Sequence, residues 1–125
     1  MALDILIVDD SAAIRKILLR VLTQTTLAIG KIHEAADGVE ALRVLEANPV
    51  SLILSDINMP GMDGIELVTR VRDLSATRAL PSLMIASQND RHHWLKAEDA
   101  GVSGFVVKPF DAIQLGEEIA RVLGS

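Results

Sequence analysis

The sequence contains no cysteine, which excludes disulfide bonds, thiolate metal ligands and cysteine nucleophiles. Aromatic residues make up only 2% of the chain, so a hydrophobic core has to be aliphatic. The formal net charge is −5 at pH 7, which disfavours direct binding to nucleic acid. No apolar run approaches the roughly 18 residues of a membrane span, and no basic segment typical of a signal peptide opens the chain. We therefore expect a cytoplasmic protein without membrane insertion or direct nucleic-acid binding.

The remaining composition is that of an ordinary globular domain. Of the 125 residues, 50% are hydrophobic and 23% are charged. A chain of this length buries roughly two-thirds of its unfolded surface and needs no covalent or metal staple. Because no repeat, linker or low-complexity stretch interrupts it, we predict a single domain over residues 1–125.

Short apolar runs alternate with helix-period segments along the chain. The runs carry apolar residues on both faces, which is typical of buried parallel strands, and they lie at 5–8, 52–54 and 83–86, at 105–107 and, more weakly, at 31–35. Apolar residues at helical spacing follow each run, around 14–22, 42–45, 65–71 and 115–123, and a more polar helix is expected over 90–100. Ser11 and Asp63 are expected N-caps, and Gly101 an expected C-cap. This alternation predicts an α/β fold, a doubly wound five-stranded parallel sheet with five helices on both faces.

Polar side chains follow four of the five predicted strands. Asp9 and Asp10 follow the first strand, Asp56 the third, Ser87 the fourth and Lys108 the fifth. In parallel sheets of this kind, ligands bind at the carboxyl ends of the strands, which lie at one edge. We therefore expect three carboxylates and one ammonium group to share a small cleft.

Three crowded carboxylates repel one another unless they take up protons or share a cation. Oxygen ligands without histidine or cysteine suit a hard cation, and Mg²⁺ in particular combines few carboxylates with waters and a phosphate. A magnesium ion together with a lysine stabilises a phosphoryl group during transfer. The cluster therefore indicates phosphoryl chemistry with Mg²⁺ as the cofactor.

Four motifs, in this order and spacing, carry a resemblance to a known family: residues 8–10 (Val-Asp-Asp), residues 56–64 (Asp-Ile-Asn-Met-Pro-Gly-Met-Asp-Gly), Ser87, and residues 104–110 (Gly-Phe-Val-Val-Lys-Pro-Phe). Over essentially its whole length the chain resembles the response-regulator receiver domain, in the CheY-like, single-domain layout. The resemblance implies a flavodoxin-like strand order 2-1-3-4-5, which comes from the resemblance alone. It also implies a two-component signalling protein without an output domain, which is not a conventional enzyme but catalyses its own phosphorylation and dephosphorylation.

The resemblance assigns a role to each residue of the cluster. Asp56 would accept a phosphoryl group from a phosphohistidine on a histidine kinase or phosphotransfer protein. Lys108 would pair with Asp56 before transfer and with the phosphoryl oxygens afterwards. Mg²⁺ would be held directly by Asp10, by Asp56 and by the backbone carbonyl of Asn58, and through a water molecule by Asp9.

The resemblance also implies a switch. The hydroxyl of Ser87 would bond a phosphoryl oxygen, and Phe105, at a position where the family often has tyrosine, would then turn inward. The fourth helix, fifth strand and fifth helix would present the signal to a downstream protein, for which Trp94 is a candidate contact. The peptide bond between Lys108 and Pro109 would be cis. We expect a monomer that can pair with a second copy on activation.

Simpler interpretations remain open for several residues. Asp9 and Asp10 could cap the first helix, and Ser87 could be a turn residue. Phe105 could be a fixed part of the core, and Trp94 could be partly buried packing rather than an interface.

Three other functions compete with the phosphorylated switch. A receiver that no longer takes phosphate would be a pure binding module. A phosphatase with an aspartate nucleophile usually has a second acid two residues later, where this chain has Asn58. A flavodoxin-like cofactor binder is disfavoured because the acidic loop at 9–13 would repel a phosphate.

Overall fold

The computed structural model describes residues 2–124, in which five strands and five α-helices alternate along the chain. The elements are β1 (Leu3–Val8), α1 (Ala12–Thr23), β2 (Ile29–Ala35), α2 (Gly38–Ala47), β3 (Leu52–Asp56), α3 (Gly64–Asp73), β4 (Ser82–Ala86), the 3₁₀ helix η1 (Gln88–His93), α4 (Trp94–Ala100), β5 (Gly104–Val107) and α5 (Ala112–Gly124).

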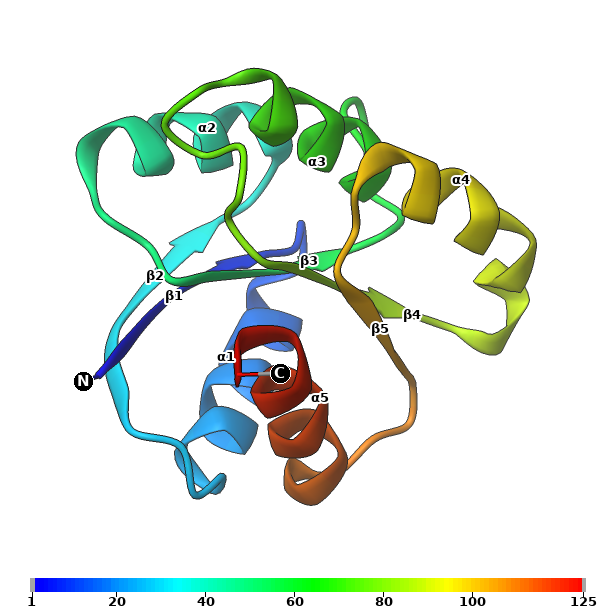
Figure 1. Cartoon of the computed structure of the whole chain (residues 1–125). Helices are drawn as coiled ribbons and strands as arrows, with labels where there is room; N and C mark the ends of the chain where they lie inside the picture. Colours follow the sequence, from blue (N-terminus) through cyan, green and yellow to red (C-terminus); the bar gives the residue numbers. More distant parts are fainter. Residues whose placement is uncertain (1, 125) are drawn as a thin grey trace.

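The five strands form one parallel sheet in the order β2-β1-β3-β4-β5, which confirms the expected doubly wound topology. Helices α1 and α5 cover one face of the sheet, and α2, α3 and α4 cover the other (Figure 1). The chain therefore forms three layers, as alternating strands and helices require when every crossover returns to the same sheet.

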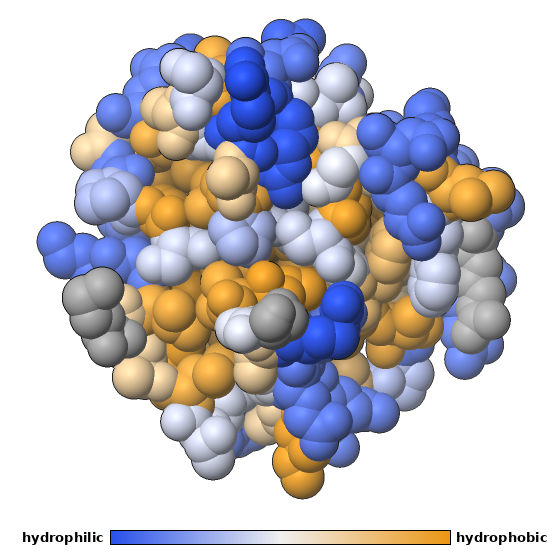
Figure 2. Space-filling view, in the orientation of Figure 1, coloured by the Kyte–Doolittle hydropathy of each residue, from blue (hydrophilic) through white to orange (hydrophobic). Residues whose placement is uncertain are grey.

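The core is aliphatic and lies on both faces of the sheet. Ile5 and Ile7 of β1 pack towards α1 and α5, whereas Leu6 and Val8 pack towards α2 and α3, as the alternation of side chains along a strand dictates. A third cluster, centred on Val68 and Met84, joins β4 to α3 and α4. On the face shown in Figure 2, hydrophobic residues gather between the helical layers and hydrophilic residues dominate the rim.

The predicted helix caps are found. The side chains of Ser11 and Asp63 each accept a hydrogen bond from the backbone N–H three residues further on, at 3.2 and 2.8 Å. Helix α4 ends at Gly101, whose φ of 102° lies in the left-handed region that favours glycine. The carbonyl of Gly101 accepts two hydrogen bonds from the guanidinium of Arg72 on α3, at 3.1 and 2.8 Å.

The predicted helix over residues 90–100 needs a correction, because its first part is not α-helical. Gln88–His93 form the 3₁₀ helix η1, and α4 begins only at Trp94. The physical reason lies in Asp90. Its carboxylate accepts hydrogen bonds from Ser87 and from the side-chain amide of Asn58, and these bonds hold the turn close to the loop after β3. The tighter turn is closed by a bond from the backbone N–H of Asp90 to the carbonyl of Ser87, at 3.0 Å.

Among residues 2–124, no helix combines the length and apolar character needed to cross a membrane.

Candidate functional site

The register between β1 and β3 places two acidic residues side by side. Val8, the last residue of β1, pairs with Ser55 of β3, so Asp9 follows at the level of Asp56. Asp10 comes directly after Asp9, on the loop that leads into α1. The expected convergence of these strand ends is therefore a consequence of the sheet register.

The register between β4 and β5 places Ser87 and Lys108 next to each other, just beyond the ends of these two strands. Ala86 pairs with Val107, and the backbone N–H of Lys108 donates to the carbonyl of Ala86 at 2.8 Å. The following peptide bond, between Lys108 and Pro109, is cis. Ser87 and Lys108 thus directly follow the last residues of β4 and β5, at the edge of the sheet that also carries Asp56.

Asp9, Asp10 and Asp56 form a cluster in which carboxylate oxygens from all three lie within 4.8 Å of one another. Asp9 is buried, Asp56 is half-buried and Asp10 is exposed, so the cluster opens towards solvent on one side. Three carboxylates without histidine or cysteine suit a hard cation, and the open side leaves room for water and a phosphoryl oxygen. The donor set therefore fits Mg²⁺.

Burial makes ionisation of two members of this cluster unfavourable. It raises the pKa of Asp56, and the neighbouring charge of Asp9 raises it further, while the ammonium of Lys108 lowers it only in part. Burial also raises the pKa of Asp9, although the backbone N–H of Ser11 donates to its Oδ1 at 2.8 Å. A divalent cation bound here would relieve both the desolvation and the repulsion.

Lys108 acts on the carboxylates through its charge rather than by direct pairing. Its charge lowers the pKa of both Asp9 and Asp56. In the part of the chain that the structure describes, however, the ion pairs are Arg15–Glu34 and Glu118–Arg121, and neither includes this lysine. The ammonium of Lys108 is therefore available for a further anionic group.

The loop after β3 turns back on Asp56. The backbone N–H of Asn58 donates to Oδ1 of Asp56 at 3.3 Å, which brings the backbone of Asn58 next to the cluster. The side chain of Asn58 points to a different partner: its amide donates to Oδ1 of Asp90 at 2.7 Å. The loop is thus tied to the segment that follows β4.

The sequence analysis gave Asp90 no role beyond the start of a helix, yet the side chain is only 7% exposed and lies beside the site. Its Oδ2 accepts from the backbone N–H of Ser87 at 2.8 Å and from the Ser87 hydroxyl at 3.0 Å. One sequence signal was available, since a serine followed by an acid three residues later is the spacing of a capping box. That signal predicts the contact with Ser87 but not the contact with Asn58.

Phe105 of β5 and Trp94, the first residue of α4, lie against each other. Their rings stack, with centroids 4.6 Å apart and planes 11° from parallel. Both side chains are half-buried, so Trp94 is neither fully buried in the core nor freely exposed. The structure is therefore compatible with both interpretations of Trp94, as partly buried packing and as a candidate partner contact, because one ring face packs on Phe105 while part of the residue is accessible.

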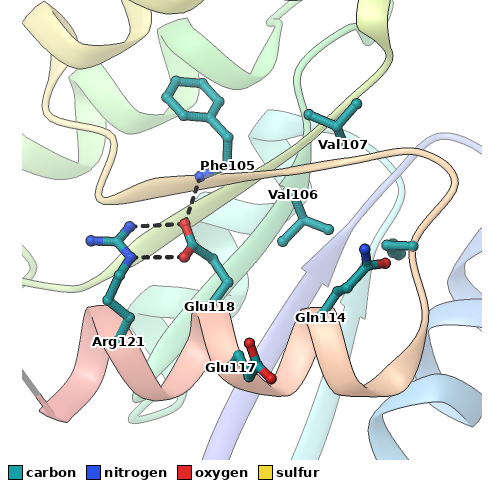
Figure 3. A pocket seen from close by; sticks show the side chains of 8 residues that line it. Phe105, Val106, Val107, Gln114, Glu117, Glu118 and Arg121 are labelled. Carbon is teal, nitrogen blue, oxygen red and sulfur yellow. Dashed lines mark hydrogen bonds and ion pairs between the residues drawn. The ribbon is translucent and has the colours of Figure 1, made fainter.

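A pocket beside Phe105 is bordered by β5 and α5 (Figure 3). The carboxylate of Glu118 accepts two hydrogen bonds from the guanidinium of Arg121, at 2.7 and 2.8 Å, and one from the backbone N–H of Phe105, at 3.3 Å. Hydrogen bonds from Arg121 hold the pKa of Glu118 below its ordinary value. This polar link fixes α5 to the backbone of β5 and leaves the ring of Phe105 pointing away from α5.

A doubly wound parallel sheet that carries three clustered aspartates, a serine and a lysine at its carboxyl edge is the arrangement that the sequence predicted for a receiver domain. The chain belongs to that family: residues 5–120 match the response regulator receiver domain family. It is a receiver of the CheY-like kind, a switch of two-component signalling.

Individual relatives agree with this assignment. The chain is 40% identical to the chemotaxis protein CheY of Pseudomonas aeruginosa, over 94% of each chain. It is 38% identical to the chemotaxis protein CheY-3 of Vibrio cholerae, over 94% of this chain and 89% of that protein.

Solved structures show the same fold. The structure of the chemotaxis protein CheY4 of Vibrio cholerae superposes with a TM-score of 0.88 at 33% identity, covering 98% of this chain and all of that chain. The receiver domain of NtrX from Brucella abortus superposes with a TM-score of 0.86 at 27% identity, covering 98% of this chain and 99% of that chain.

Proposed function

We propose that Asp56 accepts a phosphoryl group from a phosphohistidine on a histidine kinase or phosphotransfer protein, with Mg²⁺ as cofactor. The observation that carries this proposal is the position of Asp56. It is a half-buried carboxylate at the end of β3, within one cluster with two other acids and within electrostatic reach of Lys108. This arrangement supplies both the nucleophile and the charges that a phosphoryl group needs.

In the transfer step, an oxygen of Asp56 forms a bond to phosphorus while the bond between phosphorus and the imidazole nitrogen breaks, and the electron pair stays on that nitrogen. Asp10, Asp56 and the backbone carbonyl of Asn58 would hold the metal directly, and Asp9 would hold it through water. Bound Mg²⁺ would neutralise charge on the phosphoryl oxygens and on the carboxylates. The ammonium of Lys108 would take up one phosphoryl oxygen after transfer.

The readout would run from the phosphoryl group to a protein partner. The hydroxyl of Ser87 would bond a phosphoryl oxygen, and the loop after β4 would move with it. Phe105 would respond by leaving its present position, which changes the surface formed by α4, β5 and α5 and by the exposed part of Trp94. We propose that a cytoplasmic partner reads this surface, that the receiver is a monomer able to pair when activated, and that it also hydrolyses its own phosphoryl group.

The test is to incubate the protein with a small phosphodonor and Mg²⁺ and to measure its intact mass. We expect the wild type to gain the mass of one phosphoryl group, and Asp56→Asn to gain none. Asp63→Asn is the matched control, because Asp63 lies close in sequence but caps α3; this variant should be modified like the wild type. An unmodified wild type would instead favour a pure binding module.

A further inference from the structure

The buried carboxylate of Asp90 links the two loops that border the phosphoacceptor. Its Oδ1 accepts from the side-chain amide of Asn58 at 2.7 Å, and its Oδ2 accepts from the backbone N–H and the hydroxyl of Ser87, at 2.8 and 3.0 Å. Asn58 follows the acceptor Asp56 by two residues, and Ser87 is the hydroxyl expected to meet the phosphoryl group. Asp90 therefore engages one side chain from each loop.

The hydroxyl of Ser87 has a single proton, which it donates to Asp90. The same proton would be needed by a phosphoryl oxygen on Asp56, so the two acceptors compete. Burial would raise the pKa of Asp90, but the hydrogen bonds from Ser87 and Asn58 outweigh it and hold the pKa below its ordinary value. The carboxylate of Asp90 is therefore a strong acceptor for the proton of the Ser87 hydroxyl.

Helix capping accounts for only part of this arrangement. An acid that bonds the backbone N–H three residues earlier is half of a capping box, and this explains the backbone contact with Ser87. It does not explain the bond from Asn58, which lies 32 residues away in sequence. It also does not explain why the Ser87 hydroxyl is occupied by the carboxylate itself.

We propose that Asp90 is a positioning residue that latches the receiver in its unphosphorylated arrangement, and that phosphorylation of Asp56 opens the latch by taking the hydroxyl of Ser87. The inference rests on the proposed function, since it requires a phosphoryl group on Asp56. Once the hydroxyl leaves, the buried carboxylate lacks one of its three donors, which is costly. Its turn, η1, then rearranges, and η1 leads directly to Trp94 and its stack on Phe105.

The test measures how tightly each variant binds beryllofluoride, a phosphoryl mimic, at saturating Mg²⁺. Trp94 is the only tryptophan, so its fluorescence gives the midpoint of the titration. Asp90→Asn keeps the shape of the side chain but removes the charge, which leaves a weaker, neutral acceptor for the Ser87 hydroxyl. We therefore expect it to bind the mimic roughly fivefold more tightly, about the difference between a charge-assisted and a neutral hydrogen bond. Asp99→Asn, which removes an exposed charge from α4, is the control and should match the wild type.

A double-mutant cycle identifies the route of the effect. If Asp90 acts through the hydroxyl of Ser87, Asp90→Asn should change binding less than about twofold in a Ser87→Ala background. A purely structural role would give the same change in both backgrounds, or a weaker affinity in both, and would overturn the latch. If Asp90→Asn does not fold, as judged by circular dichroism, Asp90→Ser tests the same point, because its hydroxyl can still accept from the backbone of Ser87.

The outcomes separate the latch from the function on which it rests. A wild type that binds the mimic while Asp90→Asn binds no better overturns the latch alone. A wild type that neither binds the mimic nor gains mass with a phosphodonor overturns both the latch and the proposed function.

Discussion

At the scale of single residues, the protein disfavours the charged form of two carboxylates at the strand ends. Asp9 and Asp56 lie beside Asp10, in positions where burial raises the pKa of both. In the folded protein each therefore binds its proton more tightly than in the unfolded chain. Between the unfolded and the raised folded pKa, the folded state carries more protons, so the free energy of unfolding falls as pH rises through that range and stays lowered above it.

Removing one of these charges should stabilise the metal-free protein. We expect Asp56→Asn in EDTA at neutral pH to raise the melting temperature by about 2–5 °C, and to flatten the loss of stability that the wild type shows as pH rises from the acidic range. Thermal unfolding followed by circular dichroism between acidic and neutral pH measures both effects. Mg²⁺ should narrow this difference in melting temperature, because it should bind the folded wild type more strongly than the folded variant. A variant less stable than the wild type in EDTA would show that the carboxylates do not destabilise each other.

At the scale of the element, β5 contains one residue, Phe105, whose backbone and side chain have different neighbours. The backbone N–H of Phe105 is held by Glu118 of α5, whereas its ring stacks on Trp94 of α4. Such a stack contributes about 0.5–1.5 kcal/mol beyond the burial of its area. The strand thus joins two helices through one residue, by a polar contact on one side and an aromatic contact on the other.

Removing the ring should expose Trp94. We expect Phe105→Leu to shift the tryptophan emission to longer wavelength, to increase quenching by acrylamide, and to reduce by at least half the fluorescence change that beryllofluoride causes. Phe110→Leu is the matched control: it is the other phenylalanine of the chain and packs against the core beside α1 and α5. Emission that is equally unchanged in both variants would mean that the stack does not shield Trp94.

At the scale of the whole molecule, the first turn of α3 lies close against the end of β3, next to Asp56. Gly64, the first residue of α3, lies so near that a Cβ there would collide with the backbone carbonyl of Asp56 and would come within 2.9 Å of the sulfur of Met84. A backbone atom cannot move aside as the tip of a long side chain can. The position of Asp56 and the packing of α3 on the sheet therefore both depend on the absence of a side chain at Gly64.

An alanine at this position should damage stability and site together. We expect Gly64→Ala to lower the free energy of unfolding by about 1–3 kcal/mol, measured by urea denaturation, and to weaken beryllofluoride binding. Gly116→Ala provides the control, because a Cβ there meets Thr25 at an ordinary 3.5 Å and the helix gains about 0.5–1 kcal/mol from the substitution. A Gly64→Ala variant as stable as the wild type would show that α3 can shift without cost.

Much of this molecule is predictable from its sequence, for identifiable reasons. Strands buried on both faces leave uninterrupted apolar runs, and the polar residues after them stand out, so the strands and the acidic cluster were predicted correctly. The strand order needed the family resemblance. Asp90 and Glu118 were missed because their partners, Asn58 and the backbone of Phe105, become neighbours only after folding.

The two ends of α4 are held very differently. At Gly101 the guanidinium of Arg72, which also donates to the carbonyl of Leu80 at 2.6 Å, fastens the last turn to α3. At the first turn, the chain enters from η1, where the carboxylate of Asp90 accepts hydrogen bonds from the backbone N–H and the hydroxyl of Ser87. The carboxyl end of α4 is thus tied to α3, and its amino end is tied through η1 to the loop after β4, so a rearrangement of η1 would reach Trp94 before it reached Gly101.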